Sequence, residues 1–141
     1  APEKMTTLWG RRAGSMGLGG LLIPLLVLGV AGSRLQIVTE PSSRALLGAG
    51  VLLKCRFNVG GPVDLSSLRV QWYLFEERIA QYDQGRGESQ PGASMSEQEL
   101  KTGDASLFLS RVMVSDEGPY KCLVGYGAEQ MQGETTLRVL G

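Results

Sequence analysis

The stretch Asp116-Glu117-Gly118-Pro119-Tyr120-Lys121-Cys122 (DEGPYKC) decides the fold of this chain. Its tyrosine stands two positions before its cysteine. Further back along the chain, Trp72 follows Cys55 by 17 positions, and Cys122 follows Cys55 by 67 positions. The chain has only these two cysteines. Cysteine and tryptophan are among the residues that proteins bury most. We therefore expect Cys55, Trp72, Tyr120 and Cys122 to meet inside one domain.

This spacing resembles that of an immunoglobulin sandwich. In that architecture two cysteines join the two sheets and a buried tryptophan packs on the disulfide. A tyrosine two residues before the second cysteine fixes a corner through its hydroxyl group. The resemblance implies a disulfide between Cys55 and Cys122 and structural roles for Trp72, Tyr120 and Asp116. The expected fold class is all-β, a two-sheet Greek-key sandwich.

Composition excludes several classes of function. The chain has 141 residues, which fits one domain. Its formal net charge is zero, so it lacks the basic footprint of a nucleic-acid-binding protein. It has no histidine, which rules out mechanisms that use a Ser-His-Asp or Cys-His set and removes the usual zinc ligands. We expect no enzyme activity, no cofactor, no metal and no small-molecule substrate.

Residues 1–33 have the pattern of a signal peptide with an N-terminal extension. Arg11 and Arg12 form a basic region, the apolar run Leu18–Val30 follows, and small residues come after it. The run has 13 residues, whereas a membrane-spanning helix needs roughly 20. The alternative is a buried core helix, which Pro24 and the glycines in the run disfavour.

A secretory signal implies an oxidising compartment, where disulfides persist. This supports the pairing of Cys55 with Cys122 that the immunoglobulin resemblance implies. The alternative is two unrelated free thiols. We expect an extracellular location, with a membrane anchor if the chain continues past Gly141 and as a secreted protein otherwise.

From Arg34 to Gly141 short alternating apolar runs are separated by turn residues, which is typical of an all-β sandwich. The alternation points Leu68, Val70 and Trp72 to one face of a strand and Arg69, Gln71 and Tyr73 to the other. We expect roughly nine strands, with Gln84–Ser96 and Gly127–Gly133 as loops. The predicted strands are Leu35–Thr39, Arg44–Leu47 on the other sheet, Val51–Phe57, Leu68–Leu74, Arg78–Asp83, Glu97–Leu100 paired with Ala105–Ser110, Tyr120–Tyr126 and Glu134–Leu140.

A longer run around the deciding stretch narrows the resemblance. Gly103–Leu109 (GDASLFL), then Val112, Val114 and Ser115–Cys122, is similar to the same region of V-set immunoglobulin domains. More narrowly, it resembles the costimulatory and coinhibitory ligand family of antigen-presenting cells, which includes the butyrophilins. Room for extra strands between the cysteines also favours the variable type. We therefore expect residues 34–141 to form an immunoglobulin V-type domain.

The chain departs from the family pattern at two places. Many V-set domains pair the aspartate equivalent to Asp116 with an arginine, but Ala93–Ser96 contains none. Asp116 then either pairs with Arg86 or only accepts backbone hydrogen bonds. The last strand also lacks the Phe-Gly-x-Gly signature of antigen-receptor variable domains, which disfavours a rearranged receptor. Family members usually carry a constant-type domain and a membrane span, so we expect a truncated product or a fragment.

The family resemblance implies recognition of another protein through one sheet. Outward-facing residues of that sheet and its adjoining loop are the candidate contacts, because exposed aromatic and aliphatic side chains are enriched in binding hot spots. The alternative is that they only cover the sheet or pack against a partner domain. The candidate partner-binding residues are Gln71, Tyr73, Tyr82, Lys121, Leu123, Tyr126 and Met131.

The leading functional hypothesis is an extracellular immune-type ligand domain. It would bind a receptor on a lymphocyte or natural-killer cell and modulate the activity of that cell. One alternative is a V-like recognition module on the receptor side or in antigen processing. Another is homophilic adhesion, for which a weak homodimer would be the partner.

Overall fold

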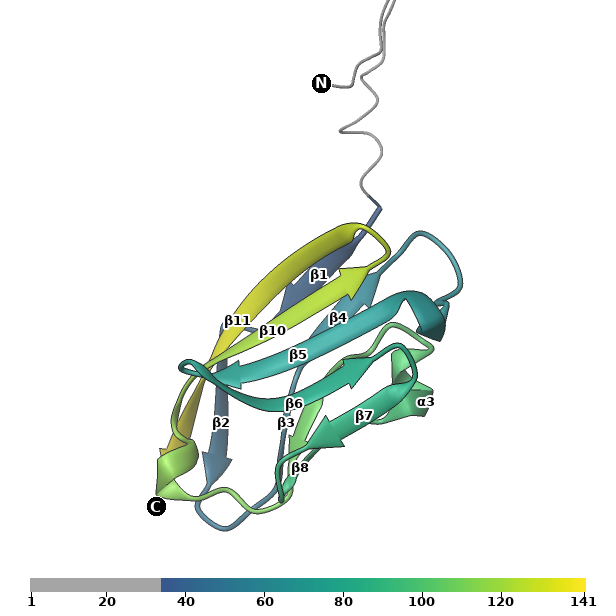
Figure 1. Ribbon diagram of the computed structural model, residues 1–141. Helices are drawn as coiled ribbons and strands as arrows, with labels where there is room; N and C mark the ends of the chain where they lie inside the picture. Colours follow the sequence, from purple (N-terminus) through teal and green to yellow (C-terminus); the bar gives the residue numbers. More distant parts are fainter. Residues whose placement is uncertain (1–33) are drawn as a thin grey trace, which may run out of the picture. The chain divides into compact units, whose positions relative to one another are not determined.

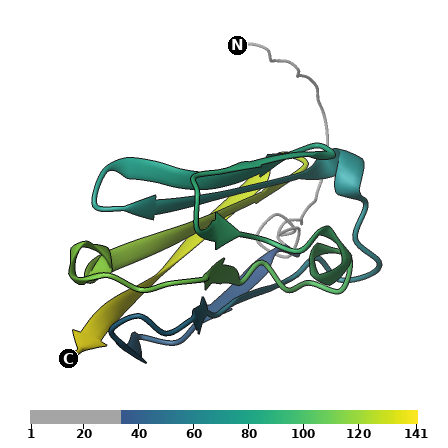
Figure 2. The same cartoon turned by 90° about the horizontal axis from the view of Figure 1, so that it is seen from below.

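The computed structural model describes residues 34–141, and the predicted signal peptide lies outside these residues. The described residues form two layers of strands, which Figures 1 and 2 show from two directions. One layer is a six-stranded sheet in the order β2-β11-β10-β5-β6-β7, and the other holds the pair β1-β4 and the three-stranded sheet β3-β9-β8. The strands are β1 (Gln36–Thr39), β2 (Ser42–Leu46), β3 (Val51–Leu53), β4 (Cys55–Asn58), β5 (Leu68–Leu74), β6 (Glu77–Asp83), β7 (Arg86–Ser89), β8 (Ala93–Ser94), β9 (Leu107–Leu109), β10 (Gly118–Tyr126) and β11 (Glu129–Leu140).

The six-stranded sheet contains the predicted central strands. β5 has the predicted bounds, and its inward residues Leu68, Val70 and Trp72 are fully buried. The chain crosses from β1 to the other layer and β2 runs parallel to β11, as predicted for the segment that follows the first strand. β6 and β7 are the extra strands between β5 and β8, and they confirm the variable-type arrangement.

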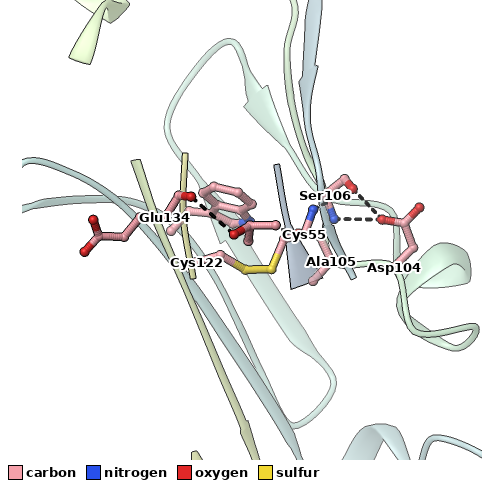
Figure 3. Close-up of a disulfide and its surroundings, with 8 residues drawn as sticks. Cys55, Asp104, Ala105, Ser106, Cys122 and Glu134 are labelled. Carbon is pink, nitrogen blue, oxygen red and sulfur yellow. Dashed lines mark hydrogen bonds between the residues drawn. A yellow bond between two sulfur atoms is a disulfide. The ribbon is translucent and has the colours of Figure 1, made fainter. Parts of the chain in front are cut away.

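The disulfide between Cys55 and Cys122 joins β4 of one layer to β10 of the other (Figure 3). Both cysteines are fully buried, and so is Trp72. The indole Nε1 of Trp72 donates a hydrogen bond of 2.8 Å to the carbonyl oxygen of Ala105, so its polar atom is satisfied inside the core. The predicted disulfide and its tryptophan partner are therefore confirmed.

The prediction of a strand at Glu97–Leu100 is wrong, because this segment is the short helix α3. The Ser96 hydroxyl oxygen accepts a hydrogen bond from the backbone N–H of Glu99, which is the usual N-terminal cap of a helix. Leu100 is fully buried and anchors the turn to the core. Two further one-turn 3-10 helices, η1 (Leu65–Ser67) and η2 (Val114–Asp116), connect strands.

Both predicted loops are shorter than expected. β11 already begins at Glu129, so the turn after β10 consists of Gly127 and Ala128, with Gly127 at a φ of 59°. The segment predicted as the loop Gln84–Ser96 contains β7 and β8. The single predicted strand Val51–Phe57 is divided at Lys54 into β3 and β4. The described residues consequently hold eleven strand segments.

Candidate functional site

The outward side of the six-stranded sheet, here called the front face, brings four candidate residues together. In the strand register Lys121 of β10 lies directly opposite Tyr73 of β5, and Leu123 lies opposite Gln71. All four side chains are half-buried. The Tyr73 hydroxyl donates a hydrogen bond of 3.0 Å to Oε1 of Gln71, which links the two pairs. Directly opposite side chains on one face of a sheet are in contact range.

The register extends this cluster with residues that the sequence analysis did not select. Gln132 of β11 lies opposite Leu123, and Gln81 of β6 lies opposite Gln71. One row across the sheet therefore consists of Gln132, Leu123, Gln71 and Gln81, in this order. Three neutral amides thus share the row with one leucine. The predicted loop Gly127–Gly133 hides Gln132 from the sequence analysis, although extending the alternation of Leu137 and Val139 back along the chain assigns it to the outward face.

A second row lies next to the first and carries charge. Glu134 of β11 is opposite Lys121, and Arg78 of β6 is opposite Tyr73. The row therefore runs from an acid through a lysine and a tyrosine to an arginine. Charges of both signs beside aromatic and aliphatic side chains can provide complementarity for a protein partner. They do not form a nucleophile with an activating base.

Tyr82 does not lie on the front face. It is opposite Val70, whose side chain points into the core, and it is only 4% exposed. Its hydroxyl donates a hydrogen bond of 2.8 Å to Oε2 of Glu97. Burial, and then the hydrogen bond and negative charge of Glu97, raise the pKa of Tyr82 to about 12. Tyr82 is therefore a core residue, contrary to its selection as a surface contact.

Tyr126 and Met131 also point away from the front face. Met131 lies opposite the inward-facing Val124, at the end of the sheet, where it is 39% exposed. Tyr126 packs against the core, and its hydroxyl oxygen accepts a hydrogen bond of 2.8 Å from the backbone N–H of Asp64. Tyr126 thus holds the loop before η1, and neither residue joins the cluster of Gln71 and Leu123.

Asp116 and Tyr120 fix the corner that leads into β10. The Tyr120 hydroxyl donates a hydrogen bond of 2.6 Å to the carbonyl oxygen of Asp116. The Asp116 carboxylate accepts a hydrogen bond of 2.7 Å from the backbone N–H of Met113, which is the second of the two alternatives that the sequence left open. Burial, and then the charge of Asp116, raise the pKa of Tyr120. Arg86 is exposed on β7 and is not the partner of Asp116.

Residues 34–141 hold neither a candidate metal site nor a candidate membrane-spanning helix. In residues 34–141 no group of three or more histidine, cysteine, aspartate or glutamate side chains is placed to hold a metal ion. No helix in the same range is both long and apolar enough to cross a membrane. The front face presents amides, a leucine and a tyrosine side by side on neighbouring strands.

The two-layer sandwich, its inter-sheet disulfide and the tyrosine corner define an immunoglobulin-type domain. The family model for the immunoglobulin V-set domain matches residues 38–140, and the chain belongs to this family. The immunoglobulin V-set domain is a non-enzymatic family, and the described domain is not an enzyme. A disulfide-bonded V-set domain is consistent with an extracellular location.

Three curated proteins are similar to this chain, and two of them are named as ligands. Programmed cell death 1 ligand 1 of Mus musculus is 31% identical over 99 residues, which cover 65% of this chain and 34% of the relative. Tapasin-related protein of Mus musculus is 30% identical over 145 residues, which cover 96% of this chain and 32% of the relative. Natural cytotoxicity triggering receptor 3 ligand 1 of Homo sapiens is 26% identical over 137 residues, which cover 92% of this chain and 30% of the relative. The chain spans about a third of the length of these relatives.

Solved structures share the fold at lower sequence identity. The human B7-H4 IgV-like domain superposes with a TM-score of 0.68 at 21% identity, over 77% of this chain and 99% of that domain. Bovine butyrophilin superposes with a TM-score of 0.63 at 18% identity, over 74% of this chain and 54% of that chain. These superpositions establish the V-type fold.

Proposed function

We propose that this chain is an extracellular ligand domain that binds a receptor on a lymphocyte or natural-killer cell through its front face and thereby modulates the activity of that cell. The observation that carries the proposal is the row of Gln132, Leu123, Gln71 and Gln81 beside Lys121 and Tyr73. The similarity to two proteins that are named as ligands of immune receptors supports it.

The chemistry of the front face suits reversible protein binding. Leu123 and Tyr73 offer apolar and aromatic surface near the centre, where interface energy concentrates. The amides of Gln71, Gln81 and Gln132 can donate and accept hydrogen bonds with any partner backbone. A standard interface buries about 800 Å² on each partner. A face that spans β11, β10, β5 and β6 provides the breadth for such a contact.

The proposal is tested by cell binding. The full chain is expressed in mammalian cells, and the secreted product is tetramerised and incubated with purified lymphocytes and natural-killer cells. We expect saturable staining of at least one of these populations, and a change in its activation when the protein is immobilised. Absence of staining from every lymphocyte and natural-killer population would contradict the proposal.

A second candidate is a recognition module on the receptor side or in antigen processing. The match to tapasin-related protein, which spans 96% of this chain, is the observation that favours it. The two candidates differ in where the partner is found. Retention of the protein inside the producing cell, with a co-purifying intracellular partner and no staining of intact lymphocytes, would favour the second candidate.

A further inference from the structure

The layer opposite the front face carries a groove of about 530 Å³ on the outward side of β1 and β4. Two cross-strand pairs lie along it, Gln36 opposite Asn58 and Val38 opposite Arg56. The segment Lys101–Gly103, which follows α3, forms the facing wall. None of these residues belongs to the front face, so the groove is a separate surface.

The facing wall is held in place by the backbone. The N–H of Phe57 donates a hydrogen bond of 2.8 Å to the carbonyl oxygen of Gly103. Gly103 has a φ of +90°, and a Cβ atom there would lie 2.5 Å from the carbonyl oxygen of Phe57. Glycine thus permits a close approach of the wall to β4 that another residue would prevent. The groove is consequently formed before any partner binds.

The groove combines apolar surface with hydrogen-bond donors and positive charge. Three valines line the groove, namely Val38, Val59 and Val63. Val38 is 68% exposed. Its lining contains two cations, Arg56 and Lys101, and no carboxylate. The chain as a whole has equal numbers of acidic and basic residues, so this groove is a local excess of positive charge.

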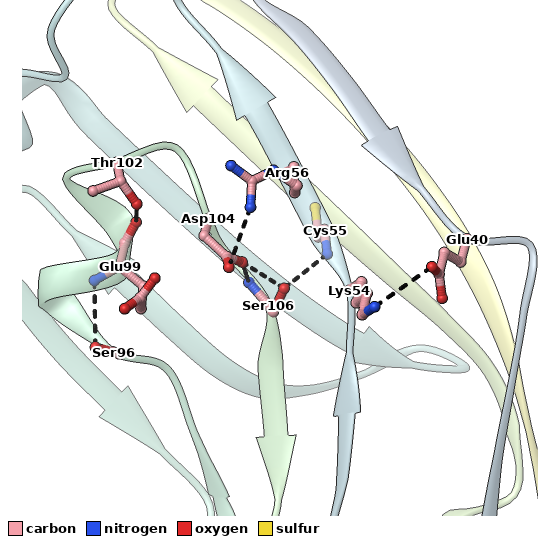
Figure 4. A network of polar contacts seen from close by, with 9 residues as sticks. All are labelled: Glu40, Lys54, Cys55, Arg56, Ser96, Glu99, Thr102, Asp104 and Ser106. Atoms are coloured by element: carbon pink, nitrogen blue, oxygen red, sulfur yellow. Dashed lines mark hydrogen bonds and ion pairs between the residues drawn. The ribbon is translucent and has the colours of Figure 1, made fainter.

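Lys101 is the uncompensated cation of the two. Arg56 forms an ion pair of 3.6 Å with Asp104, whose carboxylate also accepts hydrogen bonds from Ser106 (Figure 4). The residue four positions before Lys101 is Glu97, which would be its natural helical partner. Glu97 instead accepts the hydrogen bond of Tyr82. Among the described residues Lys101 forms no ion pair with an acidic side chain.

We propose that this groove binds an acidic peptide segment of a partner protein, with a carboxylate at Lys101 and an aliphatic side chain against Val38. Charge complementarity selects an acidic segment, and the valines select an aliphatic neighbour in that segment. Anionic membranes are recognised by clusters of about 4–8 basic residues, so two cations fit a peptide better than a lipid surface. The groove and the front face can be occupied at the same time because they lie on opposite layers.

The test uses the secreted, disulfide-bonded product of the full chain and the peptide acetyl-Glu-Leu-Glu-Leu-Glu-amide as probe. Calorimetric titration measures the affinity, and hydrogen–deuterium exchange locates the contact. We expect binding that weakens with salt, and slower exchange in residues 56–59 and 101–103. The Lys101→Gln variant should lose about fivefold in affinity, as expected for one partly screened ion pair. The matched Lys54→Gln variant should retain it, because Lys54 is exposed outside the groove and pairs with Glu40.

Each other outcome overturns the proposal. Equal affinity of the lysine peptide acetyl-Lys-Leu-Lys-Leu-Lys-amide would exclude recognition of acid. Equal loss in the Lys101→Gln and Lys54→Gln variants would reduce the binding to general charge attraction. Protection of the groove by phosphatidylserine vesicles, without protection by the acidic peptide, would assign it to lipid. No binding of the peptide would exclude the site.

Discussion

The Tyr82 hydroxyl donates a hydrogen bond of 2.8 Å to Glu97, and this contact ties β6 of the six-stranded sheet to α3, which connects two strands of the other layer. Tyr82, which the sequence suggested for the binding surface, therefore lies in the core. Its acceptor Glu97 stands four positions before Lys101, and the described residues show no ion pair between the two. The contact therefore contributes to the stability of the sandwich.

We expect the Tyr82→Phe variant to lose about 1.5–3 kcal/mol of unfolding free energy, because it removes one hydrogen bond to a charged acceptor. Urea unfolding followed by circular dichroism measures the change. Tyr73→Phe is the matched control, since it removes a hydroxyl group that bonds only to Gln71 on the front face. An equal loss in both variants would show that the contact with Glu97 does not hold the layers together.

The raised pKa of Tyr82 predicts a loss of stability in alkali. Its pKa rises from 10.0 to about 12 in the folded protein, so the folded state holds this proton more tightly than the unfolded state. The contribution is complete below pH 10 and is lost as the pH rises from 10 to 12. We expect the unfolding free energy to fall over this range, and to fall less in Tyr82→Phe. Parallel curves for the two proteins would contradict the assignment.

Gly103 and Gly48 form a matched pair for backbone strain. Both have positive φ, +90° and +85°, but only Gly103 has a backbone atom, the carbonyl oxygen of Phe57, where a Cβ would stand. We expect Gly48→Ala to cost about 1–2 kcal/mol for the left-handed conformation. Gly103→Ala should cost roughly 2 kcal/mol more, because the clash forces the wall away from β4. Equal midpoints of thermal unfolding for the two variants would show that the close approach does not matter.

Sequence reasoning found the core because its residues carry their own signal. Cys55, Trp72, Tyr120 and Cys122 stand at spacings that few architectures use, and the alternation in β5 placed Gln71 and Tyr73 outward. Tyr82 could not be placed in this way. Its direction depends on the register of β6 against β5, which shifts at a bulge between Trp72 and Tyr73. A bulge changes which face a strand presents and leaves little trace in a sequence.

The errors in the secondary structure predicted from the sequence also have local causes. A four-residue segment such as Glu97–Leu100 is too short for periodicity to distinguish helix from strand, and the cap at Ser96 decided it. The glycine at Gly133 favours a loop in the sequence, but this residue lies within β11. A Cβ at Gly133 would lie 2.5 Å from the side chain of Thr39, so its glycine serves close packing between strands.

The disulfide should supply a large part of the stability. Closing a loop with a sequence separation of 67 contributes on the order of 4 kcal/mol in the chain-entropy model. Domains are held by roughly 5–15 kcal/mol in total. We expect the double variant Cys55→Ala with Cys122→Ala to show a strongly lowered urea midpoint. A midpoint close to that of the parent protein would refute the structural role of the disulfide.

The most direct test of the account is receptor binding by a variant at the centre of the front face. Leu123→Arg places a charge between Gln71 and Gln132, and Leu52→Arg places the same charge at a 46% exposed leucine of β3 in the opposite layer. Both variants should keep the circular dichroism spectrum of the parent. In the cell-binding assay we expect Leu123→Arg to lose at least about tenfold in affinity, as at a binding hot spot, and Leu52→Arg to bind normally. Normal binding by Leu123→Arg together with loss in Leu52→Arg would place the receptor on the other layer and contradict the account.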